Sequence, residues 1–236
     1  CDFAINQSYE SIDFNTLNYN NIDVELITNF HDDLISSQII SAFKQVFSKV
    51  NPNTSCIEVG AGKRLSLLAS IHKLIGLDAY AIDPIYSNVD SFQNIKLLNS
   101  IDQLETQTKQ NIVIARNCLE YLRPEEIKIL LNKILADESL ICFELQSLNE
   151  KKWGNTFYFR EYYCFYSKLS IEKIIKQSGW NIKWISSLEL NGDERTTYIG
   201  YVTKTNFNQK LTYFESIHAL IRALKEEKSK KKIYLW

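Results

Sequence analysis

The 236-residue sequence contains no methionine, only seven glycines and three prolines, and no excess of charge of either sign. Its net charge of −1 does not favour binding to nucleic acid, which typically requires a basic face. No apolar run approaches the roughly 20 residues of a membrane-spanning helix, and the polar first residues do not resemble a signal peptide. We therefore expect a cytoplasmic protein with neither a nucleic-acid nor a membrane partner.

The absence of methionine and the start at Cys1 indicate an excerpt of a longer chain. Two explanations remain open: the natural N-terminus lies upstream, or methionine residues have been dropped from the sequence. The second explanation would alter the spacing of some motifs.

The five cysteines form no CxxC pair, which argues against a zinc ribbon or a dithiol redox site. Cys56, Cys118 and Cys142 lie in apolar, strand-like runs. A thiol in such a run acts as a small apolar side chain, so we expect these three cysteines to be reduced core residues.

From residue 51 onwards, short β-rich runs alternate with helical patterns, which is typical of stacked βαβ units and a parallel sheet. The nearly continuous apolar character of the runs predicts strands that are covered on both faces. The expected strands are 55–60, 77–83, 94–98, 111–116 and 139–146.

Amphipathic periodicity predicts helices around these strands, and a turn signal predicts a final hairpin. The clearest helices are expected at 32–50, 123–138, 167–179 and 209–232. Asn191-Gly192-Asp193 joins the strand-like runs 180–190 and 195–204. The predicted fold is α/β and Rossmann-like, a mostly parallel seven-stranded sheet with a C-terminal antiparallel hairpin. The expected divisions are 1–50, an N-terminal segment and helix for which a lid role is expected; 51–205, the main domain; and 206–236, a C-terminal helix and the start of a truncated following domain.

A glycine turn, Gly60-Ala61-Gly62, follows the first strand and is expected to present free backbone N–H groups at the carboxyl edge of the sheet. Asp83 ends the second strand, where an acid accepts hydrogen bonds from ribose hydroxyls. Leu65 occupies the place of the third glycine of a dinucleotide fingerprint, which argues against NAD or FAD. S-adenosylmethionine, which carries no phosphate, fits the shorter turn.

Several further motifs resemble those of a known family. The stretches are "EVGAGKRLSL" (58–67), "DPIY" (83–86), "RNCLEYL" (116–122), "FELQS" (143–147) and "REYYCFYS" (160–167). In this order they resemble the class I S-adenosylmethionine-dependent methyltransferases, and more narrowly the sugar C-methyltransferase-like family. The resemblance implies a sugar, in particular a nucleotide-linked sugar, as methyl acceptor.

The two ends of the chain also resemble this family. "CDFAIN" resembles the end of its N-terminal zinc-binding segment, and "KKIYLW" resembles the strand that opens its C-terminal domain. The resemblance makes Cys1 a remnant zinc ligand, but one cysteine alone holds no structural zinc, so no metal site is expected.

The glycine turn and the resemblance together give two sets of binding residues. The expected cofactor-binding residues, with Glu58 fixing the turn, are Glu58, Gly60, Ala61, Gly62, Asp83, Pro84 and Asn117. The expected substrate-binding residues, which line the acceptor side of the site, are Glu120, Glu144, Gln146 and Tyr163.

The catalytic base is the weakest part of the resemblance. Where the family has three histidines, this chain has Asn117, Tyr121 and Tyr162. A base whose pKa lies near the pH of the medium removes a proton best. Tyrosine, with an ordinary pKa of about 10, is therefore a poor substitute for histidine. The candidate catalytic residues are Tyr162, Glu161 and His31.

Two functions therefore remain open. The first is methyl transfer to a small-molecule acceptor. The second is a degenerate methyltransferase-like domain with a scaffold or cofactor-binding role, favoured by the missing histidines. A dehydrogenase is a distant third.

Overall fold

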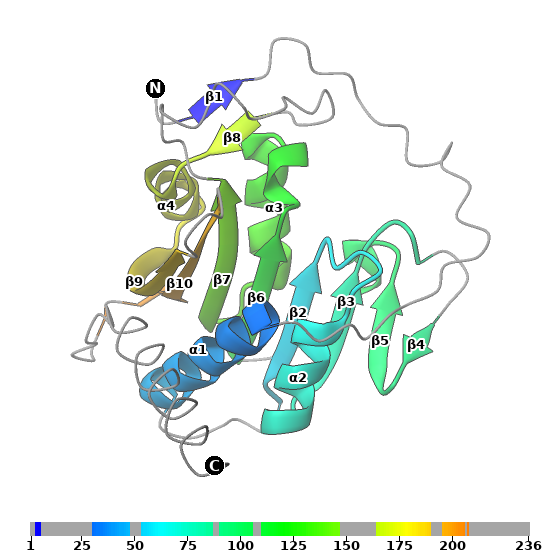
Figure 1. Ribbon diagram of the computed structural model, residues 1–236. Helices are drawn as coiled ribbons and strands as arrows, with labels where there is room; N and C mark the ends of the chain where they lie inside the picture. The colour runs from blue at the N-terminus through cyan, green and yellow to red at the C-terminus, as the bar shows by residue number, and fades with distance from the viewer. Residues whose placement is uncertain are drawn as a thin grey trace, which may run out of the picture.

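A large, mostly parallel sheet forms the centre of the computed structural model, which describes residues 3–5, 30–47, 53–86, 90–105, 110–146, 164–189, 195–205 and 207 (Figure 1). The strands of this sheet are β2 (Ser55–Val59), β3 (Asp78–Ile82), β4 (Ser91–Phe92), β5 (Ile95–Leu98), β6 (Gln110–Arg116), β7 (Glu138–Gln146), β9 (Asn181–Glu189) and β10 (Arg195–Thr203). Their spatial order is β4-β5-β3-β2-β6-β7-β10-β9.

The strand directions confirm the predicted α/β fold with an antiparallel C-terminal pair. Strands β5, β3, β2, β6 and β7 run parallel to one another, and β10 runs antiparallel to both β7 and β9. The described sheet has eight strands instead of the expected seven, because the two residues of β4 pair antiparallel with β5. The expected turn at 191–193 lies outside the described residues.

In the part of the chain that the structure describes, four α-helices cover the two faces of the sheet: α1 (Phe30–Val46), α2 (Ser66–Ile75), α3 (Pro124–Ile134) and α4 (Lys168–Gln177). In Figure 1, α1 and α2 cross one face and α3 lies behind it. Alternate residues of one strand face opposite cores: Cys56 packs in the cluster that contains α1 and α2, and Ile57 in the cluster that contains α3 and α4. Burial on both faces explains the continuous apolar runs of the sequence.

The predicted and observed ends of the helices differ, in one case because the last residue of the predicted helix belongs to a strand. The helix expected at 123–138 ends at Ile134, because Glu138 already pairs with Gln110 at the start of β7. The Asn111 side chain donates to the Ile134 carbonyl at 2.7 Å, which satisfies one carbonyl at this helix end. The helix expected at 32–50 spans Phe30–Val46.

A second, two-stranded sheet joins distant parts of the chain. Strand β1 (Phe3–Ile5) pairs antiparallel with β8 (Cys164–Tyr166), in the register Phe3 to Tyr166. The predicted helix at 209–232 and Cys1 lie outside the described residues. Among the described residues, no helix has the length and apolar character needed to cross a membrane.

Candidate functional site

The glycine turn after β2 uses its own amide groups to hold the end of β3. The amides of Gly60 and Ala61 donate to the Ile82 carbonyl at 2.8 and 3.4 Å, and the amide of Gly62 donates to Asp83 Oδ2 at 2.9 Å. The expectation that these N–H groups are free is therefore wrong. A phosphate at this turn would lack the backbone donors that cradle it in dinucleotide-binding folds.

Two side chains of the Asp-Pro-Ile-Tyr segment (83–86) form hydrogen bonds with the backbone of Gly62. Asp83 accepts the Gly62 amide, and the Tyr86 hydroxyl donates to the Gly62 carbonyl. Asp83 Oδ1 also accepts from the Ile85 amide at 3.1 Å. Burial raises the pKa of the Asp83 carboxyl, and the hydrogen bonds from Ile85 and Gly62 oppose this shift. Asp83 therefore shapes the turn, and its two oxygens keep lone pairs for further donors.

Close packing explains the first glycine of the turn. Gly60 has φ +65°, and a Cβ placed on it would lie 2.3 Å from the Cβ of Cys118. Cys118 follows β6 and is half-buried, with its sulfur 3.2 Å from the Val59 carbonyl. Cys118 was expected within a strand, but β6 ends two residues earlier, at Arg116.

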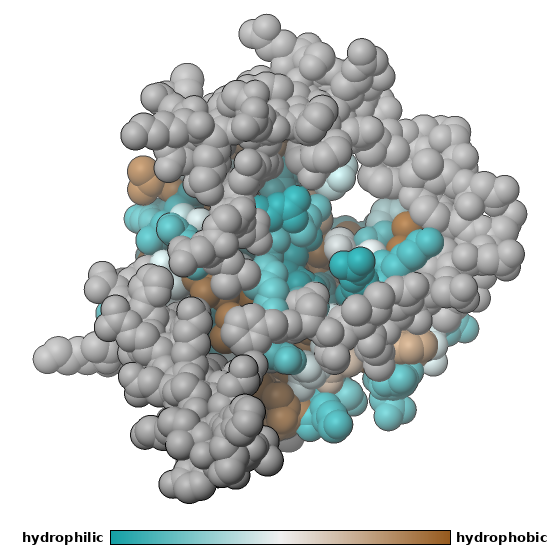
Figure 2. Space-filling view, in the orientation of Figure 1, coloured by the Kyte–Doolittle hydropathy of each residue, from teal (hydrophilic) through white to brown (hydrophobic). Residues whose placement is uncertain are grey.

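A pocket of about 480 Å³ opens beside this turn at the carboxyl edge of the parallel strands. Its size falls within the range of sites for small molecules. Figure 2 shows hydrophilic side chains gathered near the upper end of β6. The lining residues come from α1, the end of β2, the glycine turn and the two residues after it, and the ends of β6, β7 and β10: His31, Asp32, Glu58, Gly60, Ala61, Gly62, Lys63, Arg64, Arg116, Asn117, Glu144 and Arg195.

Arg116 ties two buried carboxylates together on the pocket wall. Its Nη1 lies 2.7 Å from Asp32 Oδ1, and its Nη2 lies 2.9 Å from Glu58 Oε1. Burial opposes the charge of Arg116, but the two carboxylates outweigh this effect and raise the pKa of the guanidinium. Burial also raises the pKa of Glu58, against the influence of Arg116. The described side-chain hydrogen bonds of Glu58 go to Arg116. Glu58 was expected to fix the glycine turn, but these bonds do not connect it to the turn.

Two acceptor oxygens beside the pocket have no hydrogen-bond partner among the described residues. They are Glu58 Oε2 and Asn117 Oδ1. Glu58 is 1% exposed, so its unpaired oxygen is costly unless a ligand donates to it. Asn117 adopts φ +53° at the end of β6, a conformation in which asparagine is enriched among non-glycine residues.

A second charge cluster lies where β7 meets β10. Arg195 Nη1 is 3.4 Å from Glu144 Oε1, and His31 Nε2 is 4.0 Å from Glu144 Oε2. Glu144 is 4% exposed, whereas the other two side chains are about one-third and one-quarter exposed. This end of the pocket therefore presents one buried carboxylate between two partly exposed nitrogen groups.

Glu120 lies near this cluster in the short helix η3 (Leu119–Tyr121). It is 4% exposed, and its Oε2 has no hydrogen-bond partner among the described residues. Burial is the main cause that raises the pKa of Glu120 to about 7; its own amide and Arg195 lower it, and Glu144 raises it further. Glu120 does not cap α3, because Glu126 accepts the Arg123 amide at 2.6 Å.

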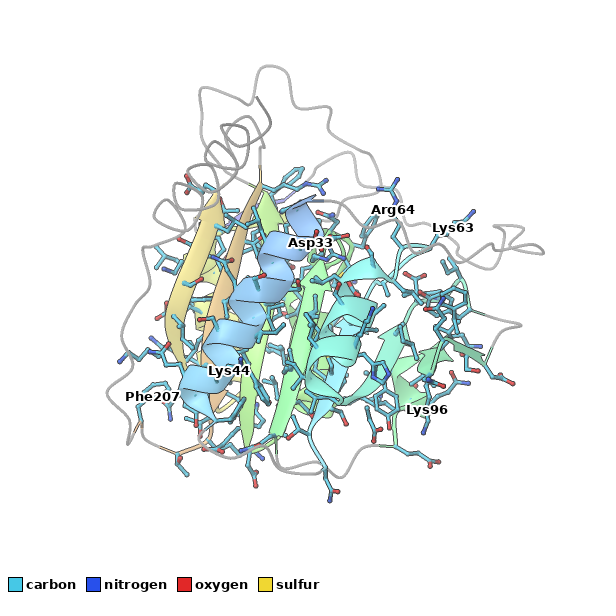
Figure 3. All side chains as sticks on the ribbon, turned by 60° about the horizontal axis from the view of Figure 1, so that its bottom comes forward. Asp33, Lys44, Lys63, Arg64, Lys96 and Phe207 are labelled. Carbon is cyan, nitrogen blue, oxygen red and sulfur yellow. The ribbon has the colours of Figure 1, made fainter. Side chains whose placement is uncertain are left out.

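The outer rim of the pocket is basic. Lys63 and Arg64 follow the glycine turn and are exposed. Figure 3 shows both side chains projecting outward beyond α2, at the edge where Asp33 marks the start of α1. Arg64 therefore lies at the rim of the pocket and not in its interior.

The structure brings most of the expected site residues to one edge. Six of them line the pocket: Glu58, Gly60, Ala61, Gly62, Asn117 and Glu144. His31, a candidate catalytic residue, lines it as well, in the first turn of α1. Asp83 supports the turn from behind and Pro84 is exposed. Glu161, Tyr162 and Tyr163 lie outside the described residues, as does the side chain of Gln146.

Sequence reasoning missed five pocket residues that carry charge: Asp32, Lys63, Arg64, Arg116 and Arg195. Asp32 and Arg116 are 84 positions apart, and no local spacing indicates their contact. The only available signal was the position of Arg116 at the carboxyl end of a buried strand, where open α/β folds place ligand-binding side chains. Among the described residues, no cluster of His, Cys, Asp and Glu is suited to hold a metal ion.

Three solved structures with a similar fold, each with bound SAH, illustrate the comparison. Magnesium protoporphyrin IX methyltransferase from Synechocystis PCC 6803, with bound SAH (S-adenosylhomocysteine), is 17% identical with a TM-score of 0.50, over 79% of this chain and 93% of that one. The plantazolicin methyltransferase BpumL in complex with SAH is 15% identical with a TM-score of 0.50, over 75% and 85%.

A single-residue variant of LepI, in complex with SAH and a substrate analogue, is 9% identical with a TM-score of 0.51 over 69% of this chain. The match spans 46% of LepI. No protein-family model and no curated protein matches the sequence. These similarities show the Rossmann-like fold of the class I S-adenosylmethionine-dependent methyltransferases, as the sequence predicted.

Proposed function

We propose that this chain is an S-adenosylmethionine-dependent methyltransferase that methylates a sugar, in particular a nucleotide-linked sugar. The observation that carries the proposal is the glycine turn, whose three amides bind β3 and Asp83 instead of a phosphate. A cofactor at this edge is therefore expected to be phosphate-free, as S-adenosylmethionine is. The solved structures of the same fold support this choice, because they contain SAH.

The pocket and the turn beside it offer groups that match the cofactor. Asp83 does not line the pocket but lies behind the glycine turn, and it has lone pairs for the two ribose hydroxyls. The unpaired oxygens of Glu58 and Asn117 are acceptors for cationic or amide-like donors, such as the ammonium of a methionine moiety. When bound, the cofactor supplies an electrophilic methyl group on a sulfonium centre. The protein positions the acceptor beside it and excludes water.

The acceptor would lie at the other end of the pocket, against Glu144, Arg195 and His31. A carboxylate and two nitrogen groups can accept from and donate to the hydroxyls of a sugar. The exposed Lys63 and Arg64 at the rim add positive charge for a linked phosphate. The sugar rests on the sequence resemblance, since the solved methyltransferases of this fold are named for magnesium protoporphyrin IX and for plantazolicin.

Isothermal titration with S-adenosylhomocysteine tests the cofactor. We expect micromolar binding and a rise in the melting temperature. The absence of both heat and thermal shift would leave the scaffold function, which the replacement of three family histidines by Asn117, Tyr121 and Tyr162 already favours.

Mass spectrometry tests the acceptor. The protein is incubated with S-adenosylmethionine and a panel of nucleotide sugars, and the expected product is heavier by one methyl group. Binding of S-adenosylhomocysteine without methylation of any sugar in the panel would contradict the proposed acceptor class and leave the cofactor proposal intact.

A further inference from the structure

We propose that His31 is the general base of the methyl transfer and that Glu144 is its positioning residue. This inference rests on the proposed methyltransferase function. It assigns the proton-accepting role to helix α1, whereas the other two candidates, Glu161 and Tyr162, lie outside the described residues.

His31 reaches the surface of the pocket on the side expected for the acceptor. It lines the pocket, and about one-quarter of its side chain is exposed. Its neighbours Glu144 and Arg195 extend from β7 and β10, which lie on the far side of β6 from the glycine turn after β2. An acceptor beside His31 would therefore face a cofactor at the glycine turn across the end of β6.

Helix α1 holds the backbone of His31 in a fixed place. The next residue, Asp32, pairs with Arg116 at the end of β6 and accepts a hydrogen bond from Ser66 at the start of α2. Leu34, three residues after His31, is buried in the core. The first turn of α1 is thus attached both to the sheet and to a neighbouring helix, as a precisely placed functional group requires.

Glu144 presents a separate oxygen to each of its two neighbours. Its Oε1 lies 3.4 Å from Arg195 Nη1, and its Oε2 lies 4.0 Å from His31 Nε2. Glu144 is 4% exposed, and its backbone pairs on both sides, with Arg116 of β6 and Thr197 of β10. The contact with His31 is electrostatic and too long for a hydrogen bond, but catalytic contacts of this kind often tighten when substrate binds.

A buried carboxylate behind a histidine ring has a defined effect on proton transfer. It orients the ring, and it stabilises the imidazolium that forms when the ring accepts a proton. Because Nε2 faces Glu144, the hydrogen of the neutral ring is expected on Nε2, and Nδ1 keeps the lone pair.

The other ionisable groups of the pocket are less suited to accept a proton. The three carboxylates that line it already form ion pairs, with Arg116 or with Arg195. Charged lysine and arginine side chains are donors only. An imidazole changes its charge near neutral pH and can accept a proton on one nitrogen while the other nitrogen donates. Among the residues that line the pocket, His31 therefore fits the role of base best.

The proton and the electron pairs of the reaction step balance. The bond between the acceptor atom and its hydrogen breaks, and the proton goes to His31 Nδ1. The electron pair left on the acceptor atom forms the new bond to the methyl carbon. The carbon–sulfur bond breaks, and its electron pair stays on sulfur, which becomes a neutral thioether. His31 returns its proton to solvent after the product leaves.

The first test examines the ring of His31 without turnover. Protein labelled with ¹⁵N in the histidine rings is studied by NMR at alkaline pH, where imidazole is neutral, and the resonances missing from His31→Gln are assigned to His31. We expect the hydrogen on Nε2. The ring resonances should shift in Glu144→Gln but not in Glu138→Gln, at the opposite end of β7. A hydrogen on Nδ1, or no response to Glu144→Gln, would overturn the inference.

The second test measures methyl transfer from S-adenosylmethionine to the panel of nucleotide sugars. His31→Ala should lower kcat about 100-fold or more, as loss of a general base does. Added imidazole should restore part of the activity, and more basic imidazole derivatives should restore more, which a purely structural role would not explain. His72→Ala is the matched control. His72 lies 2.6 Å from the Leu77 carbonyl and does not line the pocket, so this variant should keep the wild-type kcat and should not respond to imidazole.

The third test examines Glu144 through its coupling to His31. Glu144→Gln should lower kcat about tenfold or more in the wild-type background, as expected for loss of a contact with a charged group. In the His31→Ala background the same change should have little further effect, because residues that act as a unit are not additive. An equal loss of kcat in both backgrounds would overturn the positioning role.

Binding of S-adenosylhomocysteine separates this inference from the proposed function. His31→Ala should bind it with an affinity within about twofold of wild type, because His31 and the glycine turn lie on opposite sides of β6; this also shows that the variant folds. A wild type that does not bind it contradicts the proposed function, and the NMR result still decides the contact between His31 and Glu144. Unchanged kcat in His31→Ala, or a loss that imidazole does not rescue, would overturn the role of His31 as base.

Discussion

The amide of Gly62 donates a hydrogen bond to the carboxylate of Asp83, 21 residues later in the chain, at 2.9 Å. This contact joins the glycine turn after β2 to the end of β3. The same carboxylate is the proposed acceptor for the ribose hydroxyls, so a structural role within the fold and a proposed binding role fall on one side chain.

Asp83→Ala should weaken binding of S-adenosylhomocysteine at least tenfold. The variant loses a charged acceptor for ribose, which is worth roughly 1.5–3 kcal/mol, and it also loosens the turn. Asp83→Asn keeps one acceptor oxygen, so its affinity for S-adenosylhomocysteine should lie between those of wild type and Asp83→Ala. Isothermal titration gives the dissociation constants, and Asp90→Ala, at an exposed residue, serves as control. Equal affinity of Asp83→Ala and wild type would contradict the ribose assignment.

Gly60→Ala should destabilise the protein more than Gly62→Ala. Both positions have positive φ, near +60°, which costs an alanine about 1–2 kcal/mol. Only at Gly60 would the added Cβ meet a neighbour, the Cβ of Cys118 at 2.3 Å, which adds about 1–3 kcal/mol of overpacking. Urea denaturation of the two variants measures the difference. Equal loss of stability in both would show that contact with Cys118 is unimportant.

Arg116→Gln should lower the free energy of unfolding by about 3–5 kcal/mol, because it leaves the buried Glu58 carboxylate without its cation. The double variant Glu58→Gln, Arg116→Gln removes that charge and should recover part of the loss. Since burial already raises the pKa of Glu58, the single variant should regain stability as the pH falls and this carboxyl becomes protonated.

Urea denaturation at several pH values provides this measurement. A single variant as stable as wild type, or a double variant as unstable as the single one, would argue that the Glu58–Arg116 pair is dispensable.

The stability of the wild type should fall as the pH rises from about 4.5 to 7 through Glu120. The folded pKa of about 7 lies above the ordinary value of 4.5, so the folded state holds the extra proton in this window and the unfolded state does not. The loss is on the order of 3 kcal/mol. Glu120→Gln should remove this dependence and be more stable than wild type above pH 7.

Thermal or urea unfolding at pH 4.5, 6 and 8 provides the measurement, with pH values set by the two pKa values above. Glu125→Gln should follow the wild-type curve. A Glu120→Gln curve parallel to wild type would mean that this carboxyl is ionised across the whole range.

The strands could be predicted from the sequence because burial on both faces requires apolar side chains at nearly every position, as in the run around Ile112 and Val113. The glycine turn was recognisable, but the direction of its amides was not, because the acceptor, the Ile82 carbonyl, belongs to another strand. Arg116 and Asp32 were missed for the same reason: an ion pair between distant residues leaves no periodic signal. The two-residue strand β4 is too short to give a pattern.

Helix α1 supplies more than a cover for the sheet. Asp32 holds Arg116 and accepts from Ser66 at the start of α2, and Leu34, Ile35 and Ile39 are buried against the core. A chain trimmed at residue 51 would retain every strand of the large sheet but would leave Arg116 with one carboxylate and an apolar stretch of the sheet in water. The proposed boundary between the N-terminal segment and the main domain thus divides the chain in sequence but not in space, and ligand binding should disappear in the shortened protein.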